Sequence, residues 1–201
     1  MPVTTANRLE MVASGKVDLE CGTTTASLSR QEKVDFSLMT FVDGGGLLTK
    51  KDLKLGAVAD LADKRIAIIR GTTTESALER FLKESFVAVK YVPVKNHVEG
   101  IAALEKGLVE AFASDRGILA GLAITSKDPG QFALPGIIFS YEPHGFMLRR
   151  NDASFRLAVN RALAELYRSG AVAPIYERWF GAFGRPSPAI EAMYLLNGLP
   201  E

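Results

Sequence analysis

Three consecutive threonines, Thr23 to Thr25, follow a short apolar alternation, and Arg30 lies five residues beyond the last of them. Hydroxyls, backbone N–H groups and a guanidinium all bind carboxylates, and arginine does so through two parallel hydrogen bonds. Capping threonines followed by a solvated helix arginine would give the same pattern. The stretch is therefore a candidate anion site that has a purely structural alternative.

Three further polar groups follow predicted strands. Thr72 to Thr74 come after Gly71, Asp115 ends an apolar run, and His97 begins a helical segment. In open α/β sheets the ligand lies at the carboxyl ends of the strands, so these groups are candidates for one site. The alternatives are a plain helix cap for the threonines, an N-cap for Asp115 and a surface position for His97. The threonine segment is no P-loop, because it lacks the lysine and the spaced glycine.

The elements that would position these groups alternate regularly in the middle of the chain. Apolar runs at 65–71, 86–94, 109–115 and 132–140 predict strands, and amphipathic segments at 72–85, 97–107 and 116–126 predict helices. This order predicts an α/β fold with a parallel, doubly wound sheet. Gly44 to Gly46 predict a flexible or tightly bent crossing, and two further helices are expected near 155–170 and 172–181.

Composition excludes several classes of function. The chain has 201 residues, 47% hydrophobic content and a formal net charge of +1, with 24 basic and 23 acidic residues interspersed, so no nucleic-acid partner is indicated. One cysteine, Cys21, and two distant histidines offer neither a disulfide nor a zinc site. We expect Cys21 to be a small buried apolar residue. No apolar run reaches the roughly 18 residues of a membrane span, and the N-terminus has no signal-peptide pattern.

Several stretches in the same order carry a resemblance to a known family. "CGTTTASLSRQEKVDFS", "FVDGGGLLTKK", "RIAIIRGTTTE", "AFASD", "GFMLRRND" and "FRLAVNRALAELYRSGAVAPIYERWFG" resemble family 3 extracellular solute-binding proteins of amino-acid ABC transporters. Arg8 and His97 make the chain most similar to the glutamate/aspartate-binding branch. The resemblance implies the type II periplasmic-binding-protein fold, with two doubly wound α/β lobes joined by two crossing strands. The implied division is 1–45 for a partial first lobe, 46–138 for the second lobe, and 139–201 for a crossing strand and the return to the first lobe.

The resemblance also implies a clamp for an amino acid that carries a third charge. Arg30 would bind the α-carboxylate and Asp115 would accept from the α-ammonium group. Arg8 and His97 would favour an acidic side chain, since a neutral amide would leave the guanidinium without an anion. The implied ligand-binding residues are Arg8, Thr23, Thr25, Arg30, Thr72, His97 and Asp115, and no cofactor or metal is implied.

The function implied is that of a periplasmic, non-enzymatic binding protein. It would capture L-glutamate or L-aspartate between the lobes and deliver it to an ABC permease. Relative to the family, the chain is expected to lack its N-terminal part, which would leave an open first-lobe edge suited to a homodimer. Two alternatives stay open: a truncated fragment with weak or no ligand binding, and a lyase on the same fold, similar to cyclohexadienyl dehydratase. A lyase of this kind, or a lytic transglycosylase, would need a general acid, for which Glu75 and Glu110 are the candidates. A sensor module would need a transmembrane segment beside the two lobes.

Overall fold

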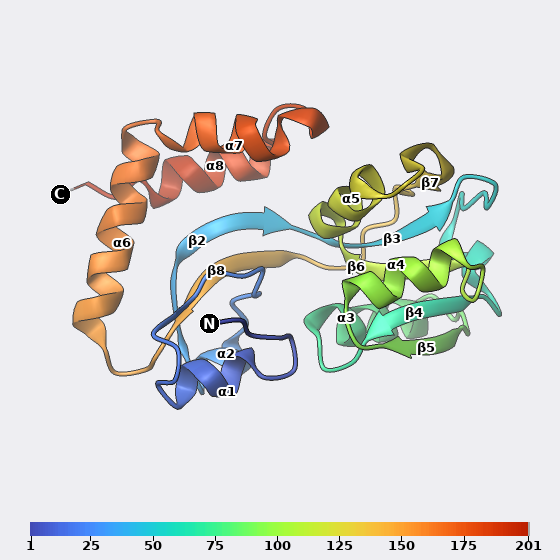
Figure 1. The fold of residues 1–201 in the computed structure, drawn as a ribbon, viewed down its shortest axis with the longest axis horizontal. Coiled ribbons are helices and arrows are strands. Elements are labelled where there is room, and N and C mark those ends of the chain that lie inside the picture. The colour runs from blue at the N-terminus through green and yellow to red at the C-terminus, as the bar shows by residue number, and fades with distance from the viewer. Residues whose placement is uncertain (201) are drawn as a thin grey trace. The chain divides into compact units, whose positions relative to one another are not determined.

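The computed structural model describes residues 1–200 and divides into two compact units (Figure 1). Unit 1 comprises Met1–Val42 and Pro143–Glu201, and unit 2 comprises Asp43–Glu142. The chain therefore passes from one unit to the other twice. Each unit has its own sheet and its own buried apolar clusters.

Unit 2 contains a five-stranded sheet in the order β5-β4-β6-β3-β7. The strand β4 pairs in parallel with β5 and β6, whereas β3 pairs antiparallel with both β6 and β7. The predicted parallel core is thus confirmed, and it carries an antiparallel strand that the sequence pattern did not identify. The elements of unit 2 are β3 (Gly45–Lys50), η1 (Val58–Leu61), β4 (Arg65–Ile69), α3 (Thr73–Glu84), β5 (Lys90–Val94), α4 (His97–Glu105), β6 (Ala111–Asp115), α5 (Arg116–Thr125), η2 (Pro129–Gln131) and β7 (Phe132–Ala133).

Both faces of this sheet are buried, as a doubly wound sheet requires. Along β4, Ile66 and Ile68 belong to one apolar cluster, which includes Leu78 of α3. Ala67, from the same strand, belongs to the opposite cluster, which includes Leu119 of α5. The alternation of side chains along one strand therefore supplies two separate cores. These cores hold α3 and α5 against the sheet.

Two predicted strands are shorter than their apolar runs. The run at 86–94 pairs only from Lys90, because Phe86 has a left-handed φ of 56° and is 97% exposed. The run at 132–140 pairs only at Phe132 and Ala133. Pro135, which has no backbone N–H to donate, follows soon after. Apolar content alone overestimated the length of both strands.

Unit 1 contains a three-stranded sheet in the order β1-β8-β2. Two side chains of α6 form hydrogen bonds with backbone groups of β2. Asn160 Oδ1 accepts from Leu38 N at 2.9 Å, and the Tyr167 hydroxyl donates to the Met39 carbonyl at 2.9 Å. A polar cover of this kind discourages pairing with another strand. The elements of unit 1 are α1 (Arg8–Ala13), β1 (Leu19–Glu20), α2 (Leu28–Gln31), β2 (Asp35–Asp43), β8 (Glu142–Leu148), α6 (Ala153–Arg168), α7 (Val172–Phe180), η3 (Gly181–Phe183) and α8 (Pro188–Asn197), with Asp43 and Glu142 falling on the unit 2 side of the division.

Two small apolar clusters hold unit 1 together. Val12, Val34 and Met147 form one of them. Tyr176, Ile190 and Met193 form the other. Trp179 of α7 is 68% exposed and belongs to neither cluster. Within residues 1–200, no helix has the length and apolarity needed to cross a membrane.

Candidate functional site

The threonine loop of unit 1 holds two arginines. Arg30 Nη1 donates to the carbonyl of Thr25 at 2.9 Å, and Arg8 Nη1 donates to the carbonyl of Thr23 at 3.2 Å. The Arg30 side chain is buried, since the residue is only 8% exposed. Two guanidinium groups are therefore held by carbonyls two residues apart. Thr23, one of the predicted ligand-binding residues, thus already holds Arg8 through its carbonyl.

The position of Arg30 follows from local sequence. Ser27 caps the short helix α2 by accepting from the Arg30 backbone N–H, so Arg30 lies in the first turn with its side chain directed back toward the loop. Thr25 forms an isolated antiparallel bridge with His144, and Ala26 N donates to the carbonyl of Pro143 at 2.8 Å. The loop is thus fixed on β8 as well as on α2.

The rest of the loop is fixed by a buried carboxylate. Thr24 Oγ1 donates to Glu20 Oε2 at 2.9 Å, and both residues are buried. Cys21, next to Glu20, is exposed, so the expected burial of Cys21 was wrong. Partial desolvation and then the Glu20 carboxylate raise the pKa of the Cys21 thiol. A raised pKa disfavours the thiolate, which argues against Cys21 as a nucleophile.

In unit 2 the candidate residues lie at helix starts that follow the strands. Thr72 is the N-cap of α3: its hydroxyl accepts from Glu75 N at 3.1 Å and donates to the carbonyl of Ile69 at 2.8 Å. The hydroxyl of Thr72 therefore has structural partners, as the capping alternative predicted. What Thr72 offers a ligand is its place at the positive end of a twelve-residue helix. Gly71 precedes it with a φ of +74°, a turn conformation that glycine adopts without strain.

His97 and Asp115 are brought together through β6. The His97 ring, at the start of α4, lies 3.2 Å from Ser114 Oγ, and Ser114 precedes Asp115 on the strand. Thr74 Oγ1 of α3 lies 3.4 Å from Asp115 Oδ1. The starts of α3 and α4 therefore each contact the end of β6. Ser114 was not identified from the sequence, although its place beside Asp115 on a predicted strand end was a usable signal.

Asp115 occupies the N-cap position of α5 without acting as its cap. Its side chain makes no capping hydrogen bond to that helix. The first turn is capped instead by Asp43, whose Oδ2 accepts from Gly117 N at 2.9 Å. The N-cap alternative for Asp115 is therefore wrong in its chemistry. No local sequence signal identifies Asp43, because it lies 74 residues away in the chain.

The two candidate general acids are both engaged in ion pairs. Glu110 accepts from the Arg65 side chain and from Arg65 N, and the hydrogen bonds from Arg65 lower the pKa of Glu110. Glu75 pairs with Arg70 at 2.5 Å and accepts from Gly71 N at 2.7 Å. A general acid needs a proton to donate near neutral pH, so a lowered pKa is opposite to the requirement.

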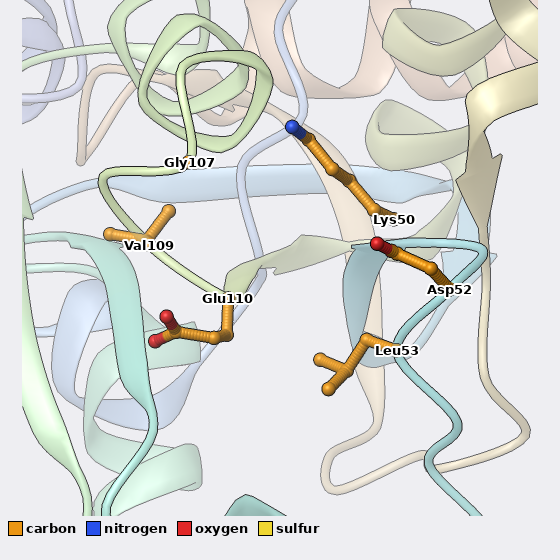
Figure 2. A pocket seen from close by; sticks show the side chains of 6 residues that line it. All are labelled: Lys50, Asp52, Leu53, Gly107, Val109 and Glu110. Carbon is orange, nitrogen blue, oxygen red and sulfur yellow. The ribbon is translucent and has the colours of Figure 1, made fainter.

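A separate pocket of about 310 Å³ lies in unit 2 (Figure 2). None of the seven predicted ligand residues lines it. In Figure 2 the Lys50 side chain points away from Leu53, and its ammonium donates to the carbonyl of Glu105 at 2.9 Å. The lining residues are Lys50, Asp52, Leu53, Gly107, Val109 and Glu110. No group of three or more histidine, cysteine, aspartate or glutamate residues within residues 1–200 could hold a metal ion.

The site residues and the fold together define the class. Each unit carries groups that suit charged ligands, two guanidinium groups in unit 1 and a helix start, an imidazole and a carboxylate in unit 2, and the fold is the type II periplasmic-binding-protein fold. Residues 1–182 match the bacterial extracellular solute-binding proteins, family 3, and the chain belongs to that family.

Similar proteins agree with this assignment. The chain is 36% identical over 178 residues to an L-glutamate/L-aspartate-binding protein of Pseudomonas aeruginosa, covering 89% of this chain and 59% of that protein. It is 33% identical over 180 residues to a glutamate/aspartate import solute-binding protein of Escherichia coli, covering 90% and 60%. A solved structure of an ancestral amino acid-binding protein, described as a precursor of cyclohexadienyl dehydratase, has a TM-score of 0.76 and 28% identity, covering 90% and 76%. The chain spans about 60% of the length of the two curated relatives.

Proposed function

We propose that this chain binds an acidic L-amino acid, glutamate or aspartate, as part of a solute-binding protein that delivers its ligand to an ABC permease. The observation that carries the proposal is the pair of guanidinium groups, Arg8 and Arg30, held by carbonyls of one threonine loop. A neutral amino acid has one carboxylate, whereas glutamate and aspartate have two. The loop supplies one guanidinium for each carboxylate.

The energetics of transfer from water favour such a ligand. A carboxylate that leaves water must recover several kcal/mol of hydration free energy, and each hydrogen bond to a charged group returns about 1.5–3 kcal/mol. Four such bonds suffice for micromolar affinity, about 8 kcal/mol, before the entropic costs of association are subtracted. A glutamine ligand would desolvate the second guanidinium without giving it an anion, so it should bind more weakly.

Unit 2 supplies the complementary groups in this proposal. Asp115 accepts from the ligand ammonium, the start of α3 at Thr72 contributes to carboxylate binding, and His97 favours the acidic side chain. The contacts that support these roles are those of His97 with Ser114 and of Asp115 with Thr74. Within unit 1, Thr25 completes the cradle of Arg30.

The same geometry favours binding without catalysis. The carboxylates of Glu75 and Glu110 are occupied by arginines, and the pKa of Glu110 is lowered. The names of the curated relatives are those of binding proteins. The dehydratase alternative rests on similarity to a binding protein described as a precursor of cyclohexadienyl dehydratase, and a shared fold does not by itself imply a shared function. We therefore assign no reaction to the chain.

Calorimetric titration with L-glutamate, L-aspartate and L-glutamine tests the proposal. We expect micromolar binding of the two acidic ligands and binding of glutamine at least about tenfold weaker, the loss expected for one unpaired charged group. Equal affinity for glutamine would refute the role of the second guanidinium. Absence of binding by all three would favour the alternative of a fragment with weak or no ligand binding.

Two further properties of the proposal come from the family. The permease partner and a periplasmic location are what membership of an extracellular solute-binding family implies.

A homodimer through the edge of the unit 1 sheet would have to use β1, because side chains of α6 form hydrogen bonds with backbone groups of β2. Light scattering at several protein concentrations tests this partner. A monomer at every concentration would refute the homodimer.

A further inference from the structure

An acidic residue stands at each point where the chain passes between the units. Asp43 is the last residue of β2 and Glu142 is the first residue of β8, and both belong to unit 2. Figure 1 shows these two strands running on into the passages between the units. Each carboxylate accepts hydrogen bonds from groups of unit 2, at the first turn of a helix whose N-cap position is a candidate ligand residue.

Asp43 takes the place of Asp115 as the cap of α5. Asp43 Oδ2 accepts from Gly117 N at 2.9 Å, while Oδ1 accepts from Gly44 N at 2.8 Å. Gly117 is the second residue of α5, and its N–H is one of the donors that an N-cap side chain normally satisfies. The carbonyl of Gly44 also accepts from Arg116 N at 3.0 Å. Hydrogen bonds to Asp43 and Gly44 thus join the start of α5 to the first connection between the units. The side chain of Asp115, the N-cap residue, is not needed for capping.

Glu142 makes the equivalent contacts with α3. It is 1% exposed, and its Oε2 accepts from Thr73 Oγ1 at 2.9 Å. Its Oε1 accepts from Ser140 Oγ at 2.6 Å, and Ser140 Oγ in turn accepts from Gly45 N at 2.9 Å. A buried carboxylate is retained only where such partners compensate for its lost hydration. Thr73 is the residue after Thr72, so the second passage is bonded to the start of α3.

The two networks meet at one place on the sheet. Gly45, bonded through Ser140 to Glu142, pairs directly with Asp115 in the β3–β6 register. Gly44, bonded to Asp43, precedes it in the chain. A Cβ on Gly45 would lie 2.5 Å from both the Phe139 ring and Ser140 Oγ, so only glycine permits this approach. Gly44 and Gly45 thus allow close packing against residues 138–140, whereas a Cβ on Gly46 would lie 2.6 Å from Arg116 Cγ.

We propose that Asp43 and Glu142 are positioning residues, which fix the first turns of α5 and α3 so that Asp115 and Thr72 are held for the ligand. This inference rests on the proposed function for its second half, the effect on binding. Loss of Asp43 leaves Gly117 N without its acceptor, so the first turn of α5 loosens and Asp115 is no longer held for the ammonium group. Loss of Glu142 releases Thr73 and the first turn of α3.

The two acids should respond differently to amide substitution. Asp43 accepts hydrogen bonds from two backbone N–H groups, which can only donate. In Asp43→Asn the side-chain NH₂ group therefore faces one of these N–H groups, and two donors meet. Glu142 accepts from two hydroxyls, which can rotate and accept instead, so Glu142→Gln can restore the network. Glu142→Ala removes it. A merely structural acid would not be expected to show this asymmetry in ligand affinity.

The first test needs no ligand. We expect Asp43→Ala to increase the amide hydrogen exchange rate of Gly117 roughly tenfold, measured by NMR, because the N–H loses its charged acceptor. The matched control is Asp52→Ala, which changes an exposed aspartate of the same unit. Unchanged exchange of Gly117 would overturn the role of Asp43, whether or not the chain binds an amino acid.

The second test measures binding of L-glutamate by calorimetry at a temperature where every variant is folded. We expect the dissociation constant to rise roughly tenfold in Asp43→Asn and in Glu142→Ala, and to stay within about twofold in Glu142→Gln. The matched control is Glu84→Gln, at an exposed glutamate of α3. Lowered unfolding midpoints with unchanged dissociation constants would overturn the positioning role.

The two tests separate this inference from the proposed function. A wild-type chain that binds no amino acid refutes the proposed function. The amide hydrogen exchange rate of Gly117 then decides whether the inference about Asp43 holds. If Asp43→Asn does not fold, the contrast between Glu142→Ala and Glu142→Gln decides the question. Equal affinity in those two variants would refute the inference.

Discussion

Replacement of Arg30 by lysine should weaken binding of an acidic amino acid while leaving the fold intact. Arg30 is 8% exposed, and one of its terminal nitrogens donates to the Thr25 carbonyl at 2.9 Å. The guanidinium can keep that bond and still direct further N–H groups to a ligand carboxylate. Lysine keeps the charge but has a single nitrogen on a flexible stem. It can bond the carbonyl or the carboxylate well, but it cannot reproduce the planar fork.

The magnitude follows from the loss of one charged hydrogen bond. Such a bond contributes about 1.5–3 kcal/mol, and each 1.4 kcal/mol is about a factor of ten in affinity. The dissociation constant for L-glutamate should therefore rise about 10- to 150-fold in Arg30→Lys, as measured by isothermal titration. The unfolding midpoint should change little, because Ser27 still caps α2 through the backbone N–H of residue 30.

Arg161→Lys is the matched control, because Arg161 is an exposed arginine of α6 in the same unit. It should bind L-glutamate as the wild-type chain does. An Arg30→Lys variant with wild-type affinity would refute the assignment of Arg30 to the ligand carboxylate. A loss of affinity that follows a large loss of stability would refute the claim that the effect is local.

Two other outcomes test the packing and the electrostatics of unit 2. Gly100→Ala should destabilise the chain by about 1–3 kcal/mol, because the new Cβ would lie 2.4 Å from the buried ring of Phe112. Gly121→Ala, with open space around it, should not destabilise the chain, and equal denaturant midpoints for the two variants would contradict the packing argument. The pKa of Glu110 is lowered, chiefly by hydrogen bonds from the Arg65 side chain, so the pair stabilises the fold above the usual glutamate pKa and loses that effect as the pH falls through the lowered pKa. The stability difference between the wild-type chain and Glu110→Gln should therefore be largest near neutral pH and shrink in acid, and a difference independent of pH in denaturant titrations would refute the pairing.

Much of the fold could be predicted from local patterns, and most of what could not depends on distant contacts. The starts of α3 and α4 follow from Thr72 and from Asn96, whose side chains cap them. The helix α8 was not predicted, although Ser187 before Pro188 is a recognisable start signal. The strand near residue 86 was overestimated because hydrophobicity does not encode the left-handed backbone of Phe86.

The candidate site shows the same division. The residue types of Arg30 and Thr25 indicated an anion cradle, and the structure joins them by a hydrogen bond. Whether Asp115 caps its own helix could not be read from its neighbours, because the answer depends on Asp43. Either Asp43 or Asp115 could accept from Gly117 N, and only the tertiary structure shows that Asp43 does.

The exposed side chain on α7 gives the molecule a built-in optical reporter. Trp179 is the one tryptophan in the sequence, and it lies in unit 1. Its emission therefore follows unit 1, whereas far-ultraviolet circular dichroism follows the secondary structure of both units. The apolar clusters of unit 1 are smaller than those of unit 2, so we expect the fluorescence transition in urea to precede the dichroism transition. Coincident curves would instead mean that the two units unfold as a single cooperative structure.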